Sequence, residues 1–376
     1  MQDMPIAEAM RPGRAPVDTG EFKADLASLL AAAPDGLIRD HHLIELGSEQ
    51  HPWIDTGIDI AAGDKVTTFT AGKTVLTGTP IEIGADFQLW CRIGEDGEAF
   101  RGTRASNSFT ADRSGRLYIG SYFPGEWATR SGELATPLEA YEAVNGDLAM
   151  AVIRWEGEPV EALKQLLAQG DVSGLIAAEI DRLTAPVAAP DGWHYLWFVG
   201  PAEIYKDCET EEHKHAICCS ASNDCGLLLK DVPLPFVPGT KLRWSWRMEE
   251  LPSDVSEDEF FTHDYLSIAV EFENGQDLTY FWSRDLPVGT GFRCPIPTWA
   301  HRETHVAVRS GTEQLGQWVS DERDVYADYA EHVGGDMPGR IVRVWLIALT
   351  LFQQGTGKCQ YADISFQTPE GEVTVL

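Results

Sequence analysis

The chain has 376 residues, of which 43% are hydrophobic and 10% aromatic. This length exceeds one ordinary sandwich domain and supplies enough apolar side chains for two cores. The formal charge of −30, from 29 basic and 59 acidic residues, repels nucleic acid and anionic lipid, which excludes both as expected partners. No stretch approaches a membrane span in apolar length, and the N-terminal residues lack the apolar core of a secretory signal. We therefore expect a soluble, cytoplasmic protein.

The seven cysteines, an odd number, bear on the redox environment. Four cluster in the second half of the chain and three are isolated, in the order Cys208, Cys218, Cys219 and Cys225, then Cys91, Cys294 and Cys359. Reduced thiols in a cytoplasm explain this distribution better than a disulfide framework. A chain from which an export leader had been removed would show the same N-terminus, so that alternative stays open.

The first predicted element is a helix over residues 21–33. Four apolar side chains share one face at helical spacing, namely Phe22, Leu26, Leu29 and Leu30. The Pro-Asp-Gly sequence at residues 34–36 ends the helix. We expect residues 1–47 to form an N-terminal helical extension that packs on something larger.

Residues 51–66 predict the opening of an antiparallel sandwich. Apolar positions alternate there with polar ones, namely Trp53, Ile58, Ile60 and Val66. Gly57 and the pair Gly63-Asp64 supply the positive-φ positions that tight turns require. We place this sandwich at residues 48–157.

This block and several later motifs resemble the galactose-binding domain of bacterial galactophilic lectins. The later matches are Leu89-Trp90-Cys91-Arg92-Ile93-Gly94, Phe100, Phe109 and Ser114-Gly115-Arg116-Leu117-Tyr118-Ile119-Gly120. The resemblance covers about residues 50–156 and implies a galactose-binding-like β-sandwich. In such lectins, the loop after the last of these strands holds a calcium ion that binds sugar hydroxyls.

The corresponding loop of this chain, residues 121–132, departs from the lectin pattern. Calcium requires about six to eight oxygen ligands, and this loop offers aromatic rings and a cation where carboxylates and amides are needed. We expect the calcium site to be absent. The domain would then be structural or read another ligand, including sugar through Trp127, Tyr122 and Arg130.

The remaining chain predicts a short helical linker at residues 158–190 and a second sandwich at residues 191–376. Apolar residues fall on helical faces up to residue 183, and a proline-containing connector follows. Strand-like apolar runs then alternate with turn signals, at residues 242–248, 265–272, 278–282, 305–309 and 343–349. Residues 321–332 are more helical in pattern. The expected fold is mainly β, with two antiparallel, jelly-roll-like sandwiches and an N-terminal helix.

The second sandwich resembles an uncharacterised bacterial family of concanavalin-like domains. The motifs that carry the resemblance are Trp244-Ser-Trp-Arg, His263-Asp-Tyr, Leu278-Thr-Tyr-Phe-Trp-Ser, Val308-Arg-Ser-Gly, and Trp318 with Glu322 to Tyr329. The resemblance implies a fold and no settled activity. Relatives tend to show two aspartates where this chain has His263-Asp264, and an Asp-rich segment where it has residues 350–355. Both exchanges weaken a calcium role, and the first permits acid–base chemistry.

The candidate catalytic residues gather around the motif His263-Asp264-Tyr265. An imidazole beside a carboxylate can act as general acid or base, with the carboxylate as its orienter. Tyr265 or Tyr280 could donate a proton. Arg309, in an apolar strand, could clamp an anion with its planar guanidinium. The alternative for Asp264 is the satisfaction of backbone groups in a turn.

The second sandwich is rich in tryptophan, which suggests walls for a ligand. Trp244 and Trp246 share one face by the strand period, and with Trp282 they would line a solvent-reachable hollow at His263. His194 and His305 would contact substrate. His301 and His305 also flank Glu303, which gives a further acid–base cluster. The alternative for the indoles is core packing.

His213 and His215 are candidates for half of a metal site, since an extended segment would place both imidazoles on one face. Zinc would need further ligands, such as Asp264 or a thiolate of Cys208, Cys218 or Cys219. The alternative is an exposed loop. No cofactor is required by the sequence, although calcium or zinc is possible, and the phosphate-loop, dinucleotide and Gly-x-Ser-x-Gly motifs are absent.

These observations favour a lyase or hydrolase that uses acid–base chemistry on a carbohydrate or another polyhydroxylated small molecule. Its site would lie in the C-terminal sandwich or at the domain seam. One alternative is a non-catalytic protein that binds a glycan or another protein. A third is an enzyme for an apolar molecule in a Trp-lined pocket. The sequence does not determine the oligomeric state.

Overall fold

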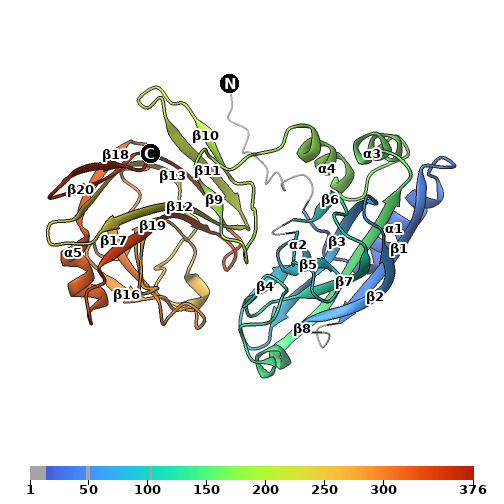
Figure 1. The fold of residues 1–376 in the computed structure, drawn as a ribbon, viewed down its shortest axis with the longest axis horizontal. Coiled ribbons are helices and arrows are strands. Elements are labelled where there is room, and N and C mark those ends of the chain that lie inside the picture. Colours follow the sequence, from blue (N-terminus) through green and yellow to red (C-terminus); the bar gives the residue numbers. More distant parts are fainter. Residues whose placement is uncertain (1–13, 48–50, 102–103) are drawn as a thin grey trace. The chain divides into compact units, whose positions relative to one another are not determined.

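The computed structural model describes residues 14–47, 51–101 and 104–376 (Figure 1). The chain divides into two compact units, Met1–Pro186 and Val187–Leu376. Antiparallel sheets dominate both units, which confirms the mainly β prediction. Among the described residues, no helix has the length and apolar character needed to cross a membrane. The prediction about a secretory signal concerns the first residues of the chain, and residues 1–13 lie outside the described ranges.

The first unit packs a five-stranded sheet against a three-stranded sheet. The larger sheet has the order β1-β8-β3-β4, with β6 also paired to β3, and the smaller has the order β2-β7-β5. Ile58, Ile60 and Val66 are buried between the sheets, as their alternation predicts. The strands are β1 Ile38–Gly47, β2 Trp53–Ile60, β3 Lys65–Leu76, β4 Glu82–Gly84, β5 Leu89–Ile93, β6 Ser106–Thr110, β7 Gly115–Ser121 and β8 Val144–Trp155.

Helices cover the outer face of the larger sheet of this unit. Helix α1 (Thr19–Ala31) begins at Asp18, whose carboxylate accepts a hydrogen bond from the Glu21 amide. Its apolar face is buried in one core with apolar residues of α3 (Pro159–Leu167) and α4 (Leu175–Thr184). The segment predicted as a linker therefore packs on the first unit, and strand β1 lies within the predicted helical extension. Short helices are α2 (Ala85–Gln88) and η1 (Leu138–Ala143).

The second unit is a sandwich of a six-stranded and a seven-stranded sheet. The six-stranded sheet has the order β10-β11-β20-β13-β18, with β21 paired to β20, and the seven-stranded sheet has the order β16-β17-β15-β14-β19-β12-β9. The pair β15 and β17 is parallel. The elements of the six-stranded sheet are β10 Tyr205–Cys208, β11 Ala216–Ser222, β13 Lys241–Glu250, β18 Val319–Asp324, β20 Thr356–Thr368 and β21 Gly371–Thr374. Those of the seven-stranded sheet are β9 His194–Tyr195, β12 Cys225–Pro235, β14 Tyr265–Phe272, β15 Asp277–Ser283, β16 Gly291–Arg293, β17 Glu303–Ser310 and β19 Arg340–Leu349.

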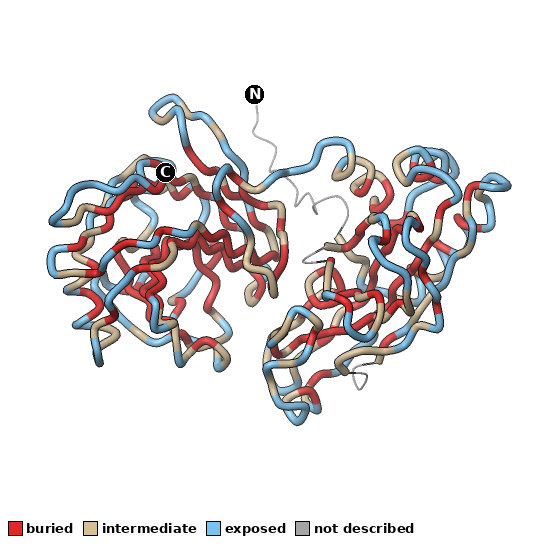
Figure 2. The backbone as a smooth tube through the Cα atoms, viewed as in Figure 1, coloured by how far each residue is buried: buried red, intermediate tan, exposed pale blue. Residues whose placement is uncertain are grey.

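The two sheets of the second unit differ in how far their strands are buried (Figure 2). Along β13, Trp244, Trp246 and Met248 are buried in the core, while Arg243 and Arg247 lie on the solvent side. In β14 and β15, by contrast, every residue is buried, so both faces of these central strands are covered. The six-stranded sheet thus exposes one face, whereas the centre of the seven-stranded sheet exposes neither.

Two local predictions for this unit are corrected. The segment predicted to be helical at residues 321–332 begins with strand β18, because Asp321 to Asp324 pair with β13, and only then continues as α5 (Val325–Asp328) and η3 (Tyr329–Val333). A further short turn, η2, spans Phe260–Thr262. Cys208 and Cys218 form a disulfide between β10 and β11, so the prediction of reduced thiols is wrong for this pair.

Candidate functional site

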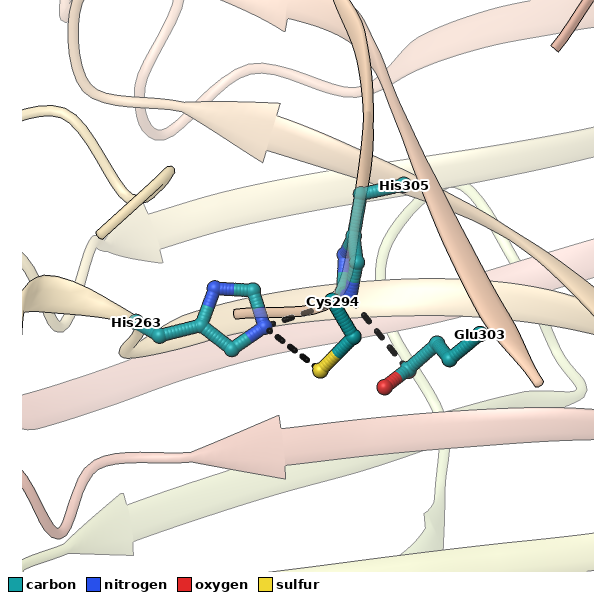
Figure 3. A group of neighbouring side chains, drawn as sticks. All are labelled: His263, Cys294, Glu303 and His305. Carbon is teal, nitrogen blue, oxygen red and sulfur yellow. Dashed lines mark hydrogen bonds and ion pairs between the residues drawn. The ribbon is translucent and has the colours of Figure 1, made fainter. Parts of the chain in front are cut away.

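Segments far apart in the sequence bring four ligand-type side chains together beside the seven-stranded sheet (Figure 3). Glu303 and His305 lie two residues apart on β17, so their side chains project from the same face. His263 caps the end of the turn η2, two residues before β14 begins, and Cys294 follows β16. We call His263, Cys294, Glu303 and His305 the buried cluster.

The polar atoms of the buried cluster lie close together. The Nε2 atoms of His263 and His305 are 3.2 Å apart, and the His263 Nε2 atom is 3.5 Å from the Cys294 Sγ atom. The His305 Nε2 atom is 3.4 Å from a Glu303 carboxylate oxygen. All four residues are at most 2% exposed. A solvent-reachable hollow at His263 was expected, and that expectation is wrong because the imidazole is fully buried.

Burial controls the protonation of two members of the cluster. It lowers the pKa of His263 to about 3, with a further contribution from neighbouring His305, so the His263 imidazole is neutral near pH 7. Burial, followed by the nearby Glu303 carboxylate, raises the pKa of the Cys294 thiol. The His263 Nδ1 atom is 2.5 Å from the Glu257 carbonyl oxygen, to which it donates. The Nε2 atom therefore presents a lone pair to the cluster.

Tyr265 belongs to the surroundings of the cluster, whereas Asp264 does not. The Tyr265 hydroxyl donates to a Glu303 carboxylate oxygen at 3.1 Å. The Asp264 carboxylate accepts from the amides of Phe352 and Gln353, at 3.0 and 2.7 Å. Burial raises the pKa of Asp264 to about 7, against the opposing effect of these amides. The prediction that Asp264 orients His263 is thus wrong, and its turn-capping alternative describes what the carboxylate does.

The predicted anion clamp and the second tyrosine lie elsewhere in the unit. The Arg309 guanidinium is paired with Asp321, with nitrogen–oxygen distances of 2.9 and 3.0 Å. The Arg309 guanidinium is therefore already paired with a carboxylate of the protein, which does not support its predicted role in binding the anionic group of a ligand. The Tyr280 hydroxyl donates to Asp328 at 2.8 Å, and its ring stacks on Trp244 within the core between the sheets.

The predicted indole walls are core side chains. Trp244, Trp246 and Trp282 are each at most 1% exposed and pack against one another, with ring centroids 5.4 and 5.7 Å apart. The prediction that their rings line an open hollow at His263 is wrong, because each ring fills the space between the sheets. His194 lies on edge strand β9, at the opposite side of the seven-stranded sheet from β16 and β17. The structure therefore brings His305 to His263 but not His194.

The predicted metal pair His213 and His215 lies between β10 and β11, in the segment that the disulfide closes. Cys208 and Cys218 are in that disulfide and offer no thiolate to a metal. The His213 Nδ1 atom is 3.1 Å from an Asp363 carboxylate oxygen, and its ring packs on Trp318. His215 is exposed. These contacts match the exposed-loop alternative rather than a metal site.

Two hollows flank the solvent-facing side of the six-stranded sheet, each with a volume of about 590 Å³. Residues of β13 and β20 contribute to both. The first is lined by Arg243, Trp244, Ser245, Ser320, Asp321, Glu322, Asp363, Ser365, Glu372, Thr374 and Leu376, and the second by Glu209, Thr210, Glu211, Glu212, Arg247 and Gln360. We call the first hollow the outer groove. This groove was not predicted from the sequence, although the polar positions that alternate with Trp244 and Trp246 were the available signal.

Comparisons with known proteins match parts of the chain. A family model described as "Protein of unknown function (DUF3047)" matches residues 191–365. No curated protein matches. The chain is 14% identical to the solved EclA N-terminal domain, a PllA-like lectin, over 32% of this chain and 99% of that one, with a TM-score of 0.25. It is 12% identical to the xyloglucanase domain of NopAA, a type three effector from Sinorhizobium fredii in complex with cellobiose, over 51% of this chain and 99% of that one, with a TM-score of 0.31.

Proposed function

We propose that this protein binds a neutral carbohydrate, or a similarly polyhydroxylated molecule, in the outer groove. The observation that carries the proposal is the polar lining of this open hollow on the exposed face of a β-sandwich. Hydroxyl and carboxylate groups from three neighbouring strands, β13, β18 and β20, face the same space. Sites for polyhydroxylated ligands use a few such convergent polar groups to fix the ligand.

The groups on the floor of the groove suit sugar hydroxyls. The Ser245 and Ser320 hydroxyl oxygens are 2.9 Å apart, and the Ser245 hydroxyl lies 3.4 Å from an Asp363 carboxylate oxygen. The Asp363 side chain is 66% exposed, so its carboxylate can accept further hydrogen bonds from the solvent side. A carboxylate can accept two hydrogen bonds from adjacent hydroxyls of one sugar ring.

The charge of the side chains that line the outer groove favours some polyhydroxylated ligands over others. Four carboxylate residues line the outer groove, namely Asp321, Glu322, Asp363 and Glu372, against one arginine, Arg243. Hydrogen bonds from Lys241 and Arg243 lower the pKa of Glu322, so this carboxylate is ionised near pH 7. Asp321 is paired with Arg309, and Glu322 with Lys241 and Arg243, so Asp363 and Glu372 supply the excess negative charge of the groove. This charge favours a neutral sugar over a uronic acid or a phosphorylated one.

An aromatic ring stands beside the polar floor. Trp318 is half-buried and packs on His213 with ring centroids 4.2 Å apart, and His213 in turn pairs with Asp363 of the groove. An indole in this position can stack on the apolar C–H face of a sugar. The proposal therefore includes Trp318 as the side chain that orients the ligand against Asp363.

Binding without turnover is the form of the proposal that we favour. Acid–base catalysis of glycosidic cleavage needs a proton donor within reach of the ligand. Glu322 is ionised and has no proton to donate. The buried His263 lies on the face of the seven-stranded sheet that is turned away from the core, so the sheet and the core separate it from the groove. The lyase or hydrolase predicted from the sequence would have to use other groups.

The test is calorimetric titration and glycan-array binding with the full chain. Asp363→Asn should weaken binding about tenfold, because a charge-assisted hydrogen bond contributes about 1.5–3 kcal/mol. Asparagine also tolerates the positive φ of 51° at this position. Asp336→Asn, which removes the same charge at an exposed site outside the groove, is the matched control. Absence of binding to any neutral glycan would refute the proposal, and release of a product would restore the enzyme prediction.

A further inference from the structure

We infer that the buried cluster binds a zinc ion through the Nε2 atoms of His263 and His305, the Cys294 thiolate and the Glu303 carboxylate. The inference concerns a different part of the second unit from the outer groove and does not depend on the proposed function. Imidazole, thiolate and carboxylate are the side chains that ligate zinc in proteins. Calcium and magnesium prefer oxygen ligands alone, which this set does not supply.

The spacing of the ligand atoms fits a tetrahedral ion. Zinc–ligand distances of about 2.0–2.3 Å imply separations of about 3.3–3.6 Å between pairs of ligand atoms at tetrahedral angles. The three distances in the cluster are 3.2 Å between the imidazole nitrogens, 3.5 Å from nitrogen to sulfur and 3.4 Å from nitrogen to carboxylate oxygen. All four ligand atoms lie within 4.8 Å of one another. Tetrahedral binding of one ion by every member would draw the more widely spaced of these atoms together by up to about 1.2 Å, which rotation of the side chains can supply.

The orientation of His263 also favours a ligand role. Its Nδ1 atom lies 2.5 Å from the Glu257 carbonyl oxygen, and this bond leaves the Nε2 lone pair directed at His305 and Cys294. Histidines that bind metals commonly donate their second ring nitrogen to a carbonyl or carboxylate in this way. The competing arrangement has no ion, and a proton on His305 Nε2 bridges the two rings. The two arrangements differ in metal content, which can be measured.

Charge balance supports a buried ion. A thiolate and a carboxylate carry two negative charges, which neutralise a divalent cation and avoid the cost of an isolated buried charge. Glu303 is further held by the hydroxyls of Tyr265 and Thr279, at 3.1 and 3.3 Å from its Oε1 atom. Such outer hydrogen bonds fix the orientation of a ligating carboxylate.

The role that follows is structural. Four protein ligands complete a tetrahedral site, and catalytic zinc sites instead keep one position open for water or substrate. None of the four residues is more than 2% exposed, so solvent does not reach the position between them. The ion would tie Cys294, in the loop between β16 and β17, to β17 itself and to the start of β14. It would thereby hold the loop that contains Cys294 against the seven-stranded sheet.

The first experiment measures metal in the purified full chain by mass spectrometry. We expect about one zinc per chain, as for a structural site with four ligands. Cys294→Ser and His263→Ala should each reduce the zinc content at least about fivefold, because loss of one ligand weakens a four-ligand site. Cys359→Ser is the matched control, since Cys359 is also a buried thiol of the second unit but lies outside the cluster. Full zinc content in both cluster variants would place the ion elsewhere and overturn the inference.

A second experiment does not depend on whether the variants fold. The wild-type chain is stripped with a chelator, loaded with Co²⁺ and examined by absorption spectroscopy. Tetrahedral cobalt with one thiolate ligand should give visible d–d bands together with a sulfur-to-metal charge-transfer band in the near ultraviolet. A chain that takes up neither zinc nor cobalt would show that the proton-bridged arrangement is correct.

Discussion

The two sheets of the second unit place their polar side chains in opposite environments. The six-stranded sheet keeps its polar residues on an exposed face, where Ser320, Glu322 and Asp363 line an open groove. The seven-stranded sheet buries polar residues on the face turned away from the core between the sheets, including Glu303 and His305. An exposed polar group can exchange water for a ligand at small cost, whereas a buried one must have a permanent partner.

This difference separates two kinds of role within one sandwich. The open groove suits reversible recognition, because its groups are partly solvated and face one space. The buried cluster suits a permanently held ion, because its donors and acceptors face only one another. The catalytic hypothesis at His263 placed a solvent-accessible reaction in the closed region, and the exposed fraction of the imidazole, 0%, contradicts that placement.

The largest expected effect comes from removal of the ion. Chelation of the full chain should lower the Tm by about 15 °C, since a structural zinc contributes several kcal/mol and about 2–4 °C accompanies each kcal/mol in a domain of this size. Differential scanning calorimetry with and without chelator measures the shift. Asp363→Asn should show the same shift as the wild type, because the groove holds no ligand of the ion. An unchanged Tm on chelation of a zinc-loaded chain would contradict a stabilising role.

The next effect tests whether the indoles are core or ligand walls. Trp246→Ala should cost about 3–5 kcal/mol of unfolding free energy, because it empties a fully buried volume. Trp318→Ala, at the half-buried ring beside the groove, should cost about 1 kcal/mol or less. Urea unfolding gives both values. If Trp318→Ala lost no sugar affinity in a chain that binds sugar, the stacking role of this ring would be wrong.

A smaller effect is expected at the hydrogen bond that supports Glu303. Tyr265→Phe removes the hydroxyl that donates to the Glu303 carboxylate and should weaken zinc affinity by about tenfold. Competition with a fluorescent zinc chelator measures the change. Tyr280→Phe is the matched control, since its hydroxyl bonds to Asp328 in the core instead. Equal effects of the two substitutions would indicate a general loss of packing rather than loss of support for the ligand.

The smallest effect concerns pH. The pKa of Glu322 lies below its ordinary value of 4.5 because Lys241 and Arg243 hydrogen-bond to it, so its charge persists as the pH falls to that value and is lost only below it. The preference for a neutral over an anionic sugar should therefore be constant between about pH 5 and 7 and weaken below about pH 4. Glu322→Gln should flatten the acidic part of that profile. Calorimetric titration at several pH values provides the measurement.

Local patterns predicted the elements of the second unit well. The alternation of residues 265–272 matches β14 at both ends, and the run at residues 242–248 lies within β13. These predictions succeed because side-chain direction repeats every two residues in any strand, whatever the strand packs against. The spacing of Glu303 and His305 likewise places both on one face of β17 before any partner is known.

The pairing of distant segments was not available from such patterns. Cys294 gave no local signal, and it meets His263 only because β16 lies beside β17 at the edge of the seven-stranded sheet. The disulfide was missed for the same reason. The odd number of cysteines favoured reduced thiols, and only the pairing of β10 with β11 brings Cys208 close to Cys218.

The amino-acid sequence alone determined the strand periodicity and the N-terminal helix, because these depend on interactions between residues close in the chain. The length and apolar content of the chain indicated its division into two parts. Tertiary structure decided which polar residues face solvent and which are enclosed. His263 and Asp363 are both polar residues of the second unit, yet one lies beneath a covered sheet and the other on an open face. Burial depends on what the rest of the chain packs against a residue, and a one-dimensional pattern does not contain that information.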